Sequence, residues 1–343
     1  MLWRRITLGL AAALIVGVGL LSGNGEAQAA PLVAPHVINK QILHETSIDG
    51  PGITKNDIGH EGDRAMVLAW TGTDPDHHLN LLTTDNGTTW KNKRTLSEMS
   101  FVRPAVERVP YMAGGEVVLA WTGTDPNHTL NVLWNAYNNG ASPMKKVTFW
   151  GDRSFTAPAI AMSGDRILLA WAGTDARHSL NIMTLSLRSL NVVSIKRYLP
   201  FSSIARPSLL IDRSGNVMLA WTTPAGQLAF ATSSPSLNFG AAKVSANTSF
   251  AGPDVLYAYS IYIRDTTTPK FWWAWIGKDA YRSIHVAFNN TAAWPPASNS
   301  ATLGDWALGG PVLAWRGTTN RVVLAWTGTD PLHRLNVAEV SLA

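Results

Sequence analysis

The chain has 343 residues, of which 46% are hydrophobic and 15% charged, and its cysteine count is zero. A chain of this composition can bury a large core and does not belong to the disordered class, and without cysteine it has no disulfide, thiolate zinc site or cysteine nucleophile. The formal net charge is +5, but the basic residues are scattered along the chain, so nucleic-acid binding is not indicated.

The first thirty residues have the pattern of a secretory signal peptide. Arg4 and Arg5 precede the apolar run Ile6 to Leu21, and small residues with the sequence Ala-Gln-Ala follow it. The apolar run is shorter than a membrane span requires, and no stop-transfer flank follows it. We expect residues 1–29 to be removed, which lowers the charge to +4. The mature protein is then expected to be secreted and to have no stable membrane span.

A strand-turn-strand motif recurs about every fifty residues. Its clear copies are AWTGTDPDHHLNLL from Ala69, VVLAWTGTDPNHTLNV from Val117, ILLAWAGTDARHSLNI from Ile167 and VVLAWTGTDPLHRLNV from Val322. Two degenerate copies, VMLAWTTPAGQLAF and FWWAWIGKDAYRSIHV, lie between the third and the last. The tryptophans of the motif stand at positions 70, 121, 171, 221, 275 and 326, and a serine-to-proline junction keeps the same period.

Each repeat contains four short apolar stretches, too short for helices and separated by Gly, Asp, Asn and Pro. Six units of four strands predict an all-β fold, a six-bladed β-propeller of antiparallel blades that spans residues 31–343, with blades starting near 51, 104, 158, 207, 253 and 311. The last unit ends after its third strand, and residues of about 37–44 align with the fourth strands of the other units. We therefore expect an N-terminal strand to complete the last blade and close the ring of a monomer.

The turn after the third strand of the first unit reads TTDNGTTW, from Thr83 to Trp90. With this box in phase with the repeat, the chain resembles the sialidase-like, Asp-box (BNR-repeat) family of propellers. The box residues are Thr83, Asp85, Gly87, Thr89 and Trp90. We expect Asp85 to accept hydrogen bonds from the amides of the turn, Gly87 to adopt a positive φ and Trp90 to pack the turn onto the sheet.

The turns of the repeated motif and the junctions before each blade share one face of a four-stranded propeller, and in the resembling family this is the ligand-binding face. Thr-Gly-Thr-Asp-Pro is itself sufficient for a tight turn, so a scaffold role is the simpler interpretation. The alternative is sugar binding, because Trp, Asp, His and Asn provide an aromatic platform and short polar groups. The candidate ligand-binding residues are Asp74, His77, Asp125, His128, Asp175, His178, Asp279, Arg282, Asp330 and His333. Each turn offers one carboxylate and usually one imidazole, too few for a metal, and we predict no metal site and no cofactor.

If the resemblance implied activity, the protein would be an exo-sialidase or a related glycoside hydrolase with an arginine cluster in the central funnel and a tyrosine nucleophile. Arg103 and Arg206 directly precede junction prolines and Tyr281 lies in a ligand-face turn, but no glutamate is near Tyr281 in the sequence. We therefore favour a secreted, lectin-like protein whose partner is a glycan or glycoconjugate. Hydrolysis is the second hypothesis, and a non-catalytic structural or protein-interaction propeller is the third.

Overall fold

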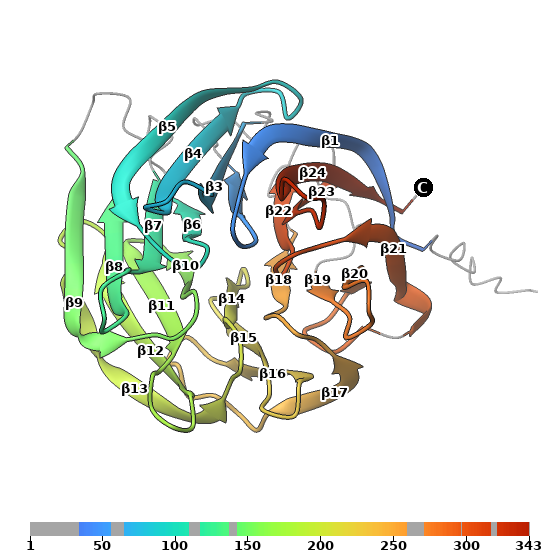
Figure 1. The fold of residues 1–343 in the computed structure, drawn as a ribbon. Helices are drawn as coiled ribbons and strands as arrows, with labels where there is room; N and C mark the ends of the chain where they lie inside the picture. The colour runs from blue at the N-terminus through green and yellow to red at the C-terminus, as the bar shows by residue number, and fades with distance from the viewer. Residues whose placement is uncertain are drawn as a thin grey trace, which may run out of the picture. The chain divides into compact units, whose positions relative to one another are not determined.

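Six four-stranded antiparallel sheets are arranged around a central axis (Figure 1). The computed structural model describes residues 34–55, 65–109, 117–136, 143–258, 271–295, 297–316 and 321–342. The predicted signal peptide lies outside these residues. The predicted all-β, six-bladed propeller is confirmed.

In blades 1 to 5 the four strands follow one another in the chain and in the sheet. Blade 1 contains β2 (Gly52–Lys55), β3 (Met66–Thr71), β4 (His78–Thr84) and β5 (Trp90–Met99). Blade 2 contains β6 (Ala105–Arg108), β7 (Val117–Thr122), β8 (Thr129–Trp134) and β9 (Lys145–Arg153). Blade 3 contains β10 (Ala159–Ser163), β11 (Arg166–Ala172), β12 (Ser179–Ser186) and β13 (Val192–Ser202).

The second half of the ring repeats this order. Blade 4 contains β14 (Ser208–Ile211), β15 (Val217–Thr222), β16 (Gln227–Ser233) and β17 (Lys243–Thr248). Blade 5 contains β18 (Asp254–Tyr257), β19 (Phe271–Ile276), β20 (Ser283–Asn289) and β21 (Ser300–Trp306), with the 3-10 turn η1 (Ala297–Asn299) before β21. Blade 6 contains β22 (Val312–Arg316), β23 (Arg321–Thr327) and β24 (Arg334–Ser341), and its outer strand is β1 (His36–Thr46).

The ring is closed by the first strand of the chain, as the sequence predicts. β1 pairs antiparallel with β24, and His36 stands opposite Ser341 in the register. The first strands of the blades contact one another around the axis in the order β2, β6, β10, β14, β18, β22 and back to β2. β1 therefore fills the place that β5, β9, β13, β17 and β21 fill in the other blades.

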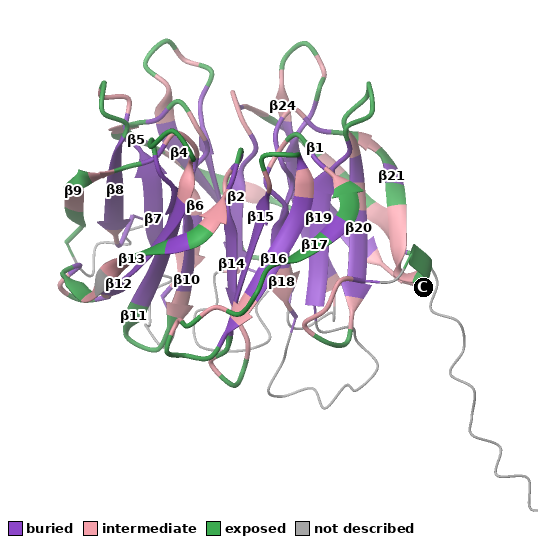
Figure 2. Cartoon of the chain, turned by 90° about the horizontal axis from the view of Figure 1, so that it is seen from below, coloured by how far each residue is buried: buried purple, intermediate pink, exposed green. Residues whose placement is uncertain are grey.

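The second strand of each blade is buried on both faces, because a neighbouring blade covers each side. Figure 2 shows the burial concentrated in the inner strands, with exposed residues in the turns and outer strands. The motif tryptophan of each blade packs between two blades, as Trp121 of blade 2 does against Val67 and Leu79 of blade 1. Five of these tryptophans, at positions 70, 121, 171, 221 and 326, are at most 2% exposed. The interpretation of these tryptophans as packing residues is confirmed.

Candidate functional site

The histidine of the repeated turn has a backbone role. His77, His128, His178 and His333 have φ values of 56°, 52°, 50° and 52°, and the same position is Arg282 in blade 5 and Gly226 in blade 4, with φ values of 55° and 78°. Positive φ is uncommon outside glycine, and histidine is among the side chains that are enriched there. The left-handed backbone of this turn is therefore one reason for a histidine at this position.

The same residue joins the turn to the next blade. The amide of His77 donates to the carbonyl of Asp74 at 3.0 Å, and the carbonyl of His77 accepts the amide of Ser100 at 3.1 Å. The equivalent bond to the following junction is present in all six blades, including Ser47 to His333 across the closure of the ring. The imidazole of His77 contacts Phe101 edge to face at 5.5 Å.

In five of the six turns an aspartate caps the turn, and blade 4 has none. Asp125 accepts bonds from the amides of Asn127 and Thr129, each at 3.1 Å, and from the Thr129 hydroxyl at 2.7 Å. Partial burial acts to raise the pKa of this carboxyl, but these hydrogen bonds outweigh it and hold the pKa below its usual value. The same pattern and the same direction of the pKa hold for Asp74, Asp175, Asp279 and Asp330. The oxygens of these carboxylates therefore already accept hydrogen bonds from groups of the turn itself.

The Asp-box turn of blade 1 differs from the prediction at its aspartate. The amides of Thr88 and Thr89 donate to Oδ1 of Asn86, at 2.9 and 2.7 Å, and not to Asp85, which forms an ion pair with Lys91. Asn86 thus takes the acceptor role because its side chain folds back over the turn, while Asp85 points to solvent. Gly87 does have a positive φ of 73°, and Trp90 packs against the core between blades 6 and 1.

The two predicted arginines reach the central axis, whereas Tyr281 does not. Arg103 is buried and donates to the carbonyls of Pro51 and Gly310, and Arg206 donates to Asp254 at 2.7 Å. Both line a pocket of about 210 Å³ at the mouth of the funnel on the turn face. Tyr281 is 63% exposed on the blade 5 turn, where its ring stacks on Trp306 at 5.2 Å.

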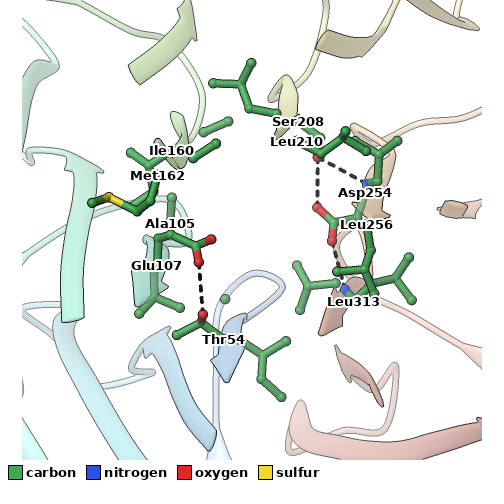
Figure 3. A pocket seen from close by; sticks show the side chains of 18 of the residues that line it. Thr54, Ala105, Glu107, Ile160, Met162, Ser208, Leu210, Asp254, Leu256 and Leu313 are labelled. Carbon is green, nitrogen blue, oxygen red and sulfur yellow. Dashed lines mark hydrogen bonds between the residues drawn. The ribbon is translucent and has the colours of Figure 1, made fainter. Parts of the chain in front are cut away.

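Below this mouth lies an axial cavity of about 350 Å³, lined by the first strands of the blades. Glu107 and Asp254 face it from opposite sides (Figure 3). Thr54 donates to Glu107 at 3.3 Å, and Ser208 and the Leu313 amide donate to Asp254. Burial raises the pKa of Glu107 to about 7. Sequence reasoning missed Glu107, because an acidic residue in a short polar strand carries no motif.

A second set of repeated polar residues lies at the seams, which are the contacts between neighbouring blades. In four seams a lysine from the outer strand of one blade lies over the motif tryptophan of that blade and pairs with an acidic residue from the outer strand of the preceding blade. We call this arrangement the staple. Its members are Glu45, Lys93 and Trp70 between blades 6 and 1; Glu98, Lys146 and Trp121 between blades 1 and 2; Asp152, Lys196 and Trp171 between blades 2 and 3; and Asp305, Lys40 and Trp326 between blades 5 and 6.

The seam between blades 6 and 1 holds a pocket of about 430 Å³ that combines a staple with a repeated turn. Glu45, Trp70 and Lys93 line it from the two blades, and Asp74 and His78 line it from the turn. Nδ1 of His78 lies 2.7 Å from Asp74 Oδ1, and Lys93 lies 2.5 Å from Glu45. Two of the predicted features, the turn aspartate and the motif tryptophan, therefore meet in one pocket, together with charged residues that the sequence analysis did not select.

Two kinds of feature are absent from the described residues: clustered metal-ligating side chains and long apolar helices. No group of three or more His, Asp or Glu side chains there is placed to hold a metal ion. Within the same residues, no helix has the length and apolarity to cross a membrane.

Comparison with known proteins identifies the fold class. No protein-family model matches the chain, and no curated protein matches it in sequence. A protein of unknown function from Dyadobacter fermentans DSM 18053 has a TM-score of 0.60 at 15% identity, over 91% of this chain and 99% of that chain. A triple arginine-to-alanine mutant of AofleA from Arthrobotrys oligospora has a TM-score of 0.58 at 11% identity, over 88% and 85%.

The fucose-specific lectin from Aleuria aurantia has a TM-score of 0.58 at 8% identity, over 89% of this chain and 96% of that chain. At these identities the likeness concerns the fold. The chain is a six-bladed β-propeller with lectin propellers among its structural neighbours, and its membership of the Asp-box family stays a prediction.

Proposed function

We propose that this protein is a secreted carbohydrate-binding propeller that recognises glycans on the face formed by its repeated turns. The observation that supports this proposal most directly is the pocket of about 430 Å³ between blades 6 and 1. Its volume suits a sugar residue, and a carboxylate, an ammonium, an imidazole and hydroxyl groups converge on it. Hydroxyl groups of a sugar both donate and accept, so a site with donors and acceptors side by side can bind them.

The fold neighbours support the same class of ligand. The Aleuria aurantia lectin is similar in fold, and one of its structures holds α-methyl-L-fucoside. That ligand belongs to that protein, and the identity of 8% does not extend it to this chain. The ligand class proposed for this chain rests on the seam pocket itself, in which Lys93 and Glu45 are two of the polar lining residues.

Glycoside hydrolysis has weaker support. Of the three residues that the family resemblance suggested, Arg103 and Arg206 lie at the axis, but Arg103 donates to two protein carbonyls and Arg206 is paired with Asp254. Tyr281 is stacked on Trp306 at the rim, away from the axial pockets. These three residues therefore do not form a common site.

The test is binding to a glycan array by the wild type and by two matched double variants. Glu45→Gln with Lys93→Met removes the charges of the seam pocket, and Glu98→Gln with Lys146→Met removes the same charges from the seam between blades 1 and 2, where Thr129 stands in place of His78. We expect the first variant to weaken glycan binding about tenfold or more, which corresponds to about 1.4 kcal/mol. The control is expected to bind as the wild type does.

A wild type that binds no glycan on the array would contradict the proposal. Equal loss in both double variants would show that the blade 1 pocket is not the site. Circular dichroism on each variant confirms that the charge removal leaves the fold intact.

A further inference from the structure

The six seams differ in what covers the motif tryptophan. Four seams use the lysine of a staple. The seam between blades 3 and 4 uses Phe201, which stands at the position of the acidic residue and stacks directly on Trp221, with ring centroids 4.6 Å apart and an interplanar angle of 23°. Five of the six motif tryptophans are therefore covered by a lysine or a phenylalanine of an outer strand.

The seam between blades 4 and 5 has neither kind of cover. Asn247 stands two residues before Ser249, as Glu98 stands two residues before Ser100, so the acidic position is an amide. Thr302 is paired with His285 in blade 5 as Thr95 is paired with Asn80 in blade 1. Ser300 stands two residues before Thr302, as Lys93 stands two residues before Thr95, so the position of the staple lysine is a serine here. Both staple residues are thus replaced by short, uncharged side chains.

β17 lies beside the sheet of blade 5 in the ring (Figure 1). A pocket of about 430 Å³ lies in this seam. Trp275, Trp294 and Phe230 give it an aromatic lining, and Asn247 and Ser300 lie at its polar side. Trp275 itself is only 4% exposed, because the His285 ring is stacked on it at 5.1 Å with an interplanar angle of 11° and the Trp294 ring lies at 5.8 Å. A cavity therefore remains at the position where the other five seams have a lysine or a phenylalanine.

The chemistry of the pocket selects an uncharged ring. Lys243 lines the pocket and lies over Phe230 at 5.5 Å, so it repels a cation of the kind that the sister seams hold over tryptophan. In the described structure, no hydrogen bond uses the amide oxygen of Asn247, whose Nδ2 donates to Ser245 at 3.1 Å. A pyranose has an apolar C–H face for an indole and hydroxyl groups for an amide and a serine.

We propose that the seam between blades 4 and 5 is a second binding pocket, which takes an uncharged pyranose ring against the aromatic lining of Trp275 and Trp294, in the place that an outer-strand lysine or phenylalanine fills in the other five seams. The ligand class rests on the proposed carbohydrate-binding function, but the site and its residues are separate from those of the blade 1 pocket. The two pockets differ in chemistry: the first is charged and the second is aromatic and uncharged.

The test fills the pocket with the side chains that this chain uses elsewhere. Asn247→Asp with Ser300→Lys installs a staple, and Asn247→Phe with Ser300→Ala copies the seam between blades 3 and 4, where Ala242 holds the lysine position. Binding of uncharged methyl pyranosides (glucoside, galactoside, mannoside, fucoside and N-acetylglucosaminide) is followed by the indole N–H resonance of Trp275, which is assigned from its loss in Trp275→Phe. The double variant Glu45→Gln with Lys93→Met is the control.

In the wild type and in the control, at least one pyranoside is expected to shift the Trp275 resonance in a saturable manner. In both filled variants, the affinity at this resonance is expected to fall about tenfold or more. If the wild type binds glycans on the array while no pyranoside shifts Trp275, the seam pocket is wrong and the proposed function stands. If the shift persists unchanged in a folded filled variant, the site is also wrong. A shift at Trp275 without any effect of the blade 1 variant on array binding would support this pocket and contradict the blade 1 site.

Discussion

His77, His128, His178 and His333 share a positive φ, and blade 4 places Gly226 at the same point of its turn. His128 is exposed, so a substitution there tests the backbone with little effect on packing. We expect His128→Val to lower the free energy of unfolding by about 1–2 kcal/mol, because a β-branched residue is strained at positive φ. His128→Asn is expected to change it by less than about 0.5 kcal/mol. Urea unfolding of both variants measures the difference, and equal losses would contradict the backbone explanation.

The histidine side chains themselves are a separate question at the residue scale. The variant that replaces His77, His128, His178 and His333 with asparagine keeps residues that tolerate the left-handed backbone. We expect it to fold and to retain glycan binding on the array, since these imidazoles are not among the residues that line the blade 1 pocket. A folded variant that loses binding would instead assign the histidines to the ligand site.

Glu107 makes stability depend on pH. Burial raises its pKa to about 7 in the folded protein, from a usual value of 4.5. The folded state therefore binds this proton more tightly, so the contribution of Glu107 to stability is complete at low pH and is lost as the pH rises from 4.5 through 7. Between pH 5 and 8 we expect the wild type to lose up to about 3 kcal/mol relative to Glu107→Gln. Burial also raises the pKa of Asp49, but this affects the wild type and the variant alike and cancels in the difference. Urea unfolding at each pH measures the difference, and parallel pH profiles of the two proteins would contradict the prediction.

Individual residues were predictable from the sequence to different degrees. The turn sequence around Asp74 predicts a tight turn and the structure confirms it, because the hydrogen bonds involved join residues at most six positions apart. The turn of blade 1 could equally use Asp85 or Asn86 as its acceptor, and only the three-dimensional path of the chain selects Asn86. The φ of His77 was not deducible from spacing alone.

At the scale of strands, the staples tie each outer strand to the next blade. Lys146 pairs with Glu98 and lies over the Trp121 ring at 5.3 Å. Both charges are partly exposed, so we expect a coupling energy of less than about 1 kcal/mol in the cycle of Glu98→Gln and Lys146→Met. Lys146→Met is expected to cost more than Glu98→Gln, because it also removes a cation–π contact worth about 0.5–1 kcal/mol.

Urea unfolding at low and high salt measures this cycle. The coupling is expected to decrease as the salt concentration rises, since mobile ions screen exposed charges. A coupling that is insensitive to salt, or a larger cost for Glu98→Gln than for Lys146→Met, would contradict this account of the staple.

The strands were predictable and the staples were not. The spacing of Trp70, Trp121 and the later motif tryptophans reports the blade period directly, because each tryptophan fills the same gap between blades. Lys93 and Glu98 stand five positions apart on one strand, as Lys40 and Glu45 do, which is a visible repeat. Each nevertheless bonds to a different blade, so the pairing needs the ring geometry as well as the sequence.

For the whole molecule, stability depends on closing the ring between blades 6 and 1. β1 pairs with β24, the Ser47 amide donates to the His333 carbonyl at 3.1 Å, and the Thr327 hydroxyl donates to the Asp49 carbonyl at 2.6 Å. These contacts repeat those of the other seams, where the chain is continuous. We therefore expect the protein to stay stable when the ring is closed at another blade, and to lose stability when the closing strand is removed.

A circular permutant tests this expectation. Residues 342 and 34 are joined by a short Asn-Gly linker, since His36 and Ser341 are opposite one another and the join makes a hairpin. New termini are opened between Ala241 and Ala242, which are exposed residues before β17, so that β17 becomes the closing strand. We expect the permutant to unfold cooperatively with a Tm within about 5 °C of the wild type, which corresponds to a change of about 3 kcal/mol or less for a domain of this size.

Deletion of residues 34–46 is the contrasting variant. It removes β1 and leaves the edge of β24 unpaired, and an exposed edge strand associates with other chains. We expect this variant to aggregate or to lose cooperative unfolding, measured by size-exclusion chromatography and thermal scans beside the permutant. If the deletion variant stays monomeric with the Tm of the wild type, the pairing of β1 with β24 is not what closes the ring. If the permutant does not fold while the deletion variant does, stability depends on where the chain begins and ends and not on the pairing of β1 with β24.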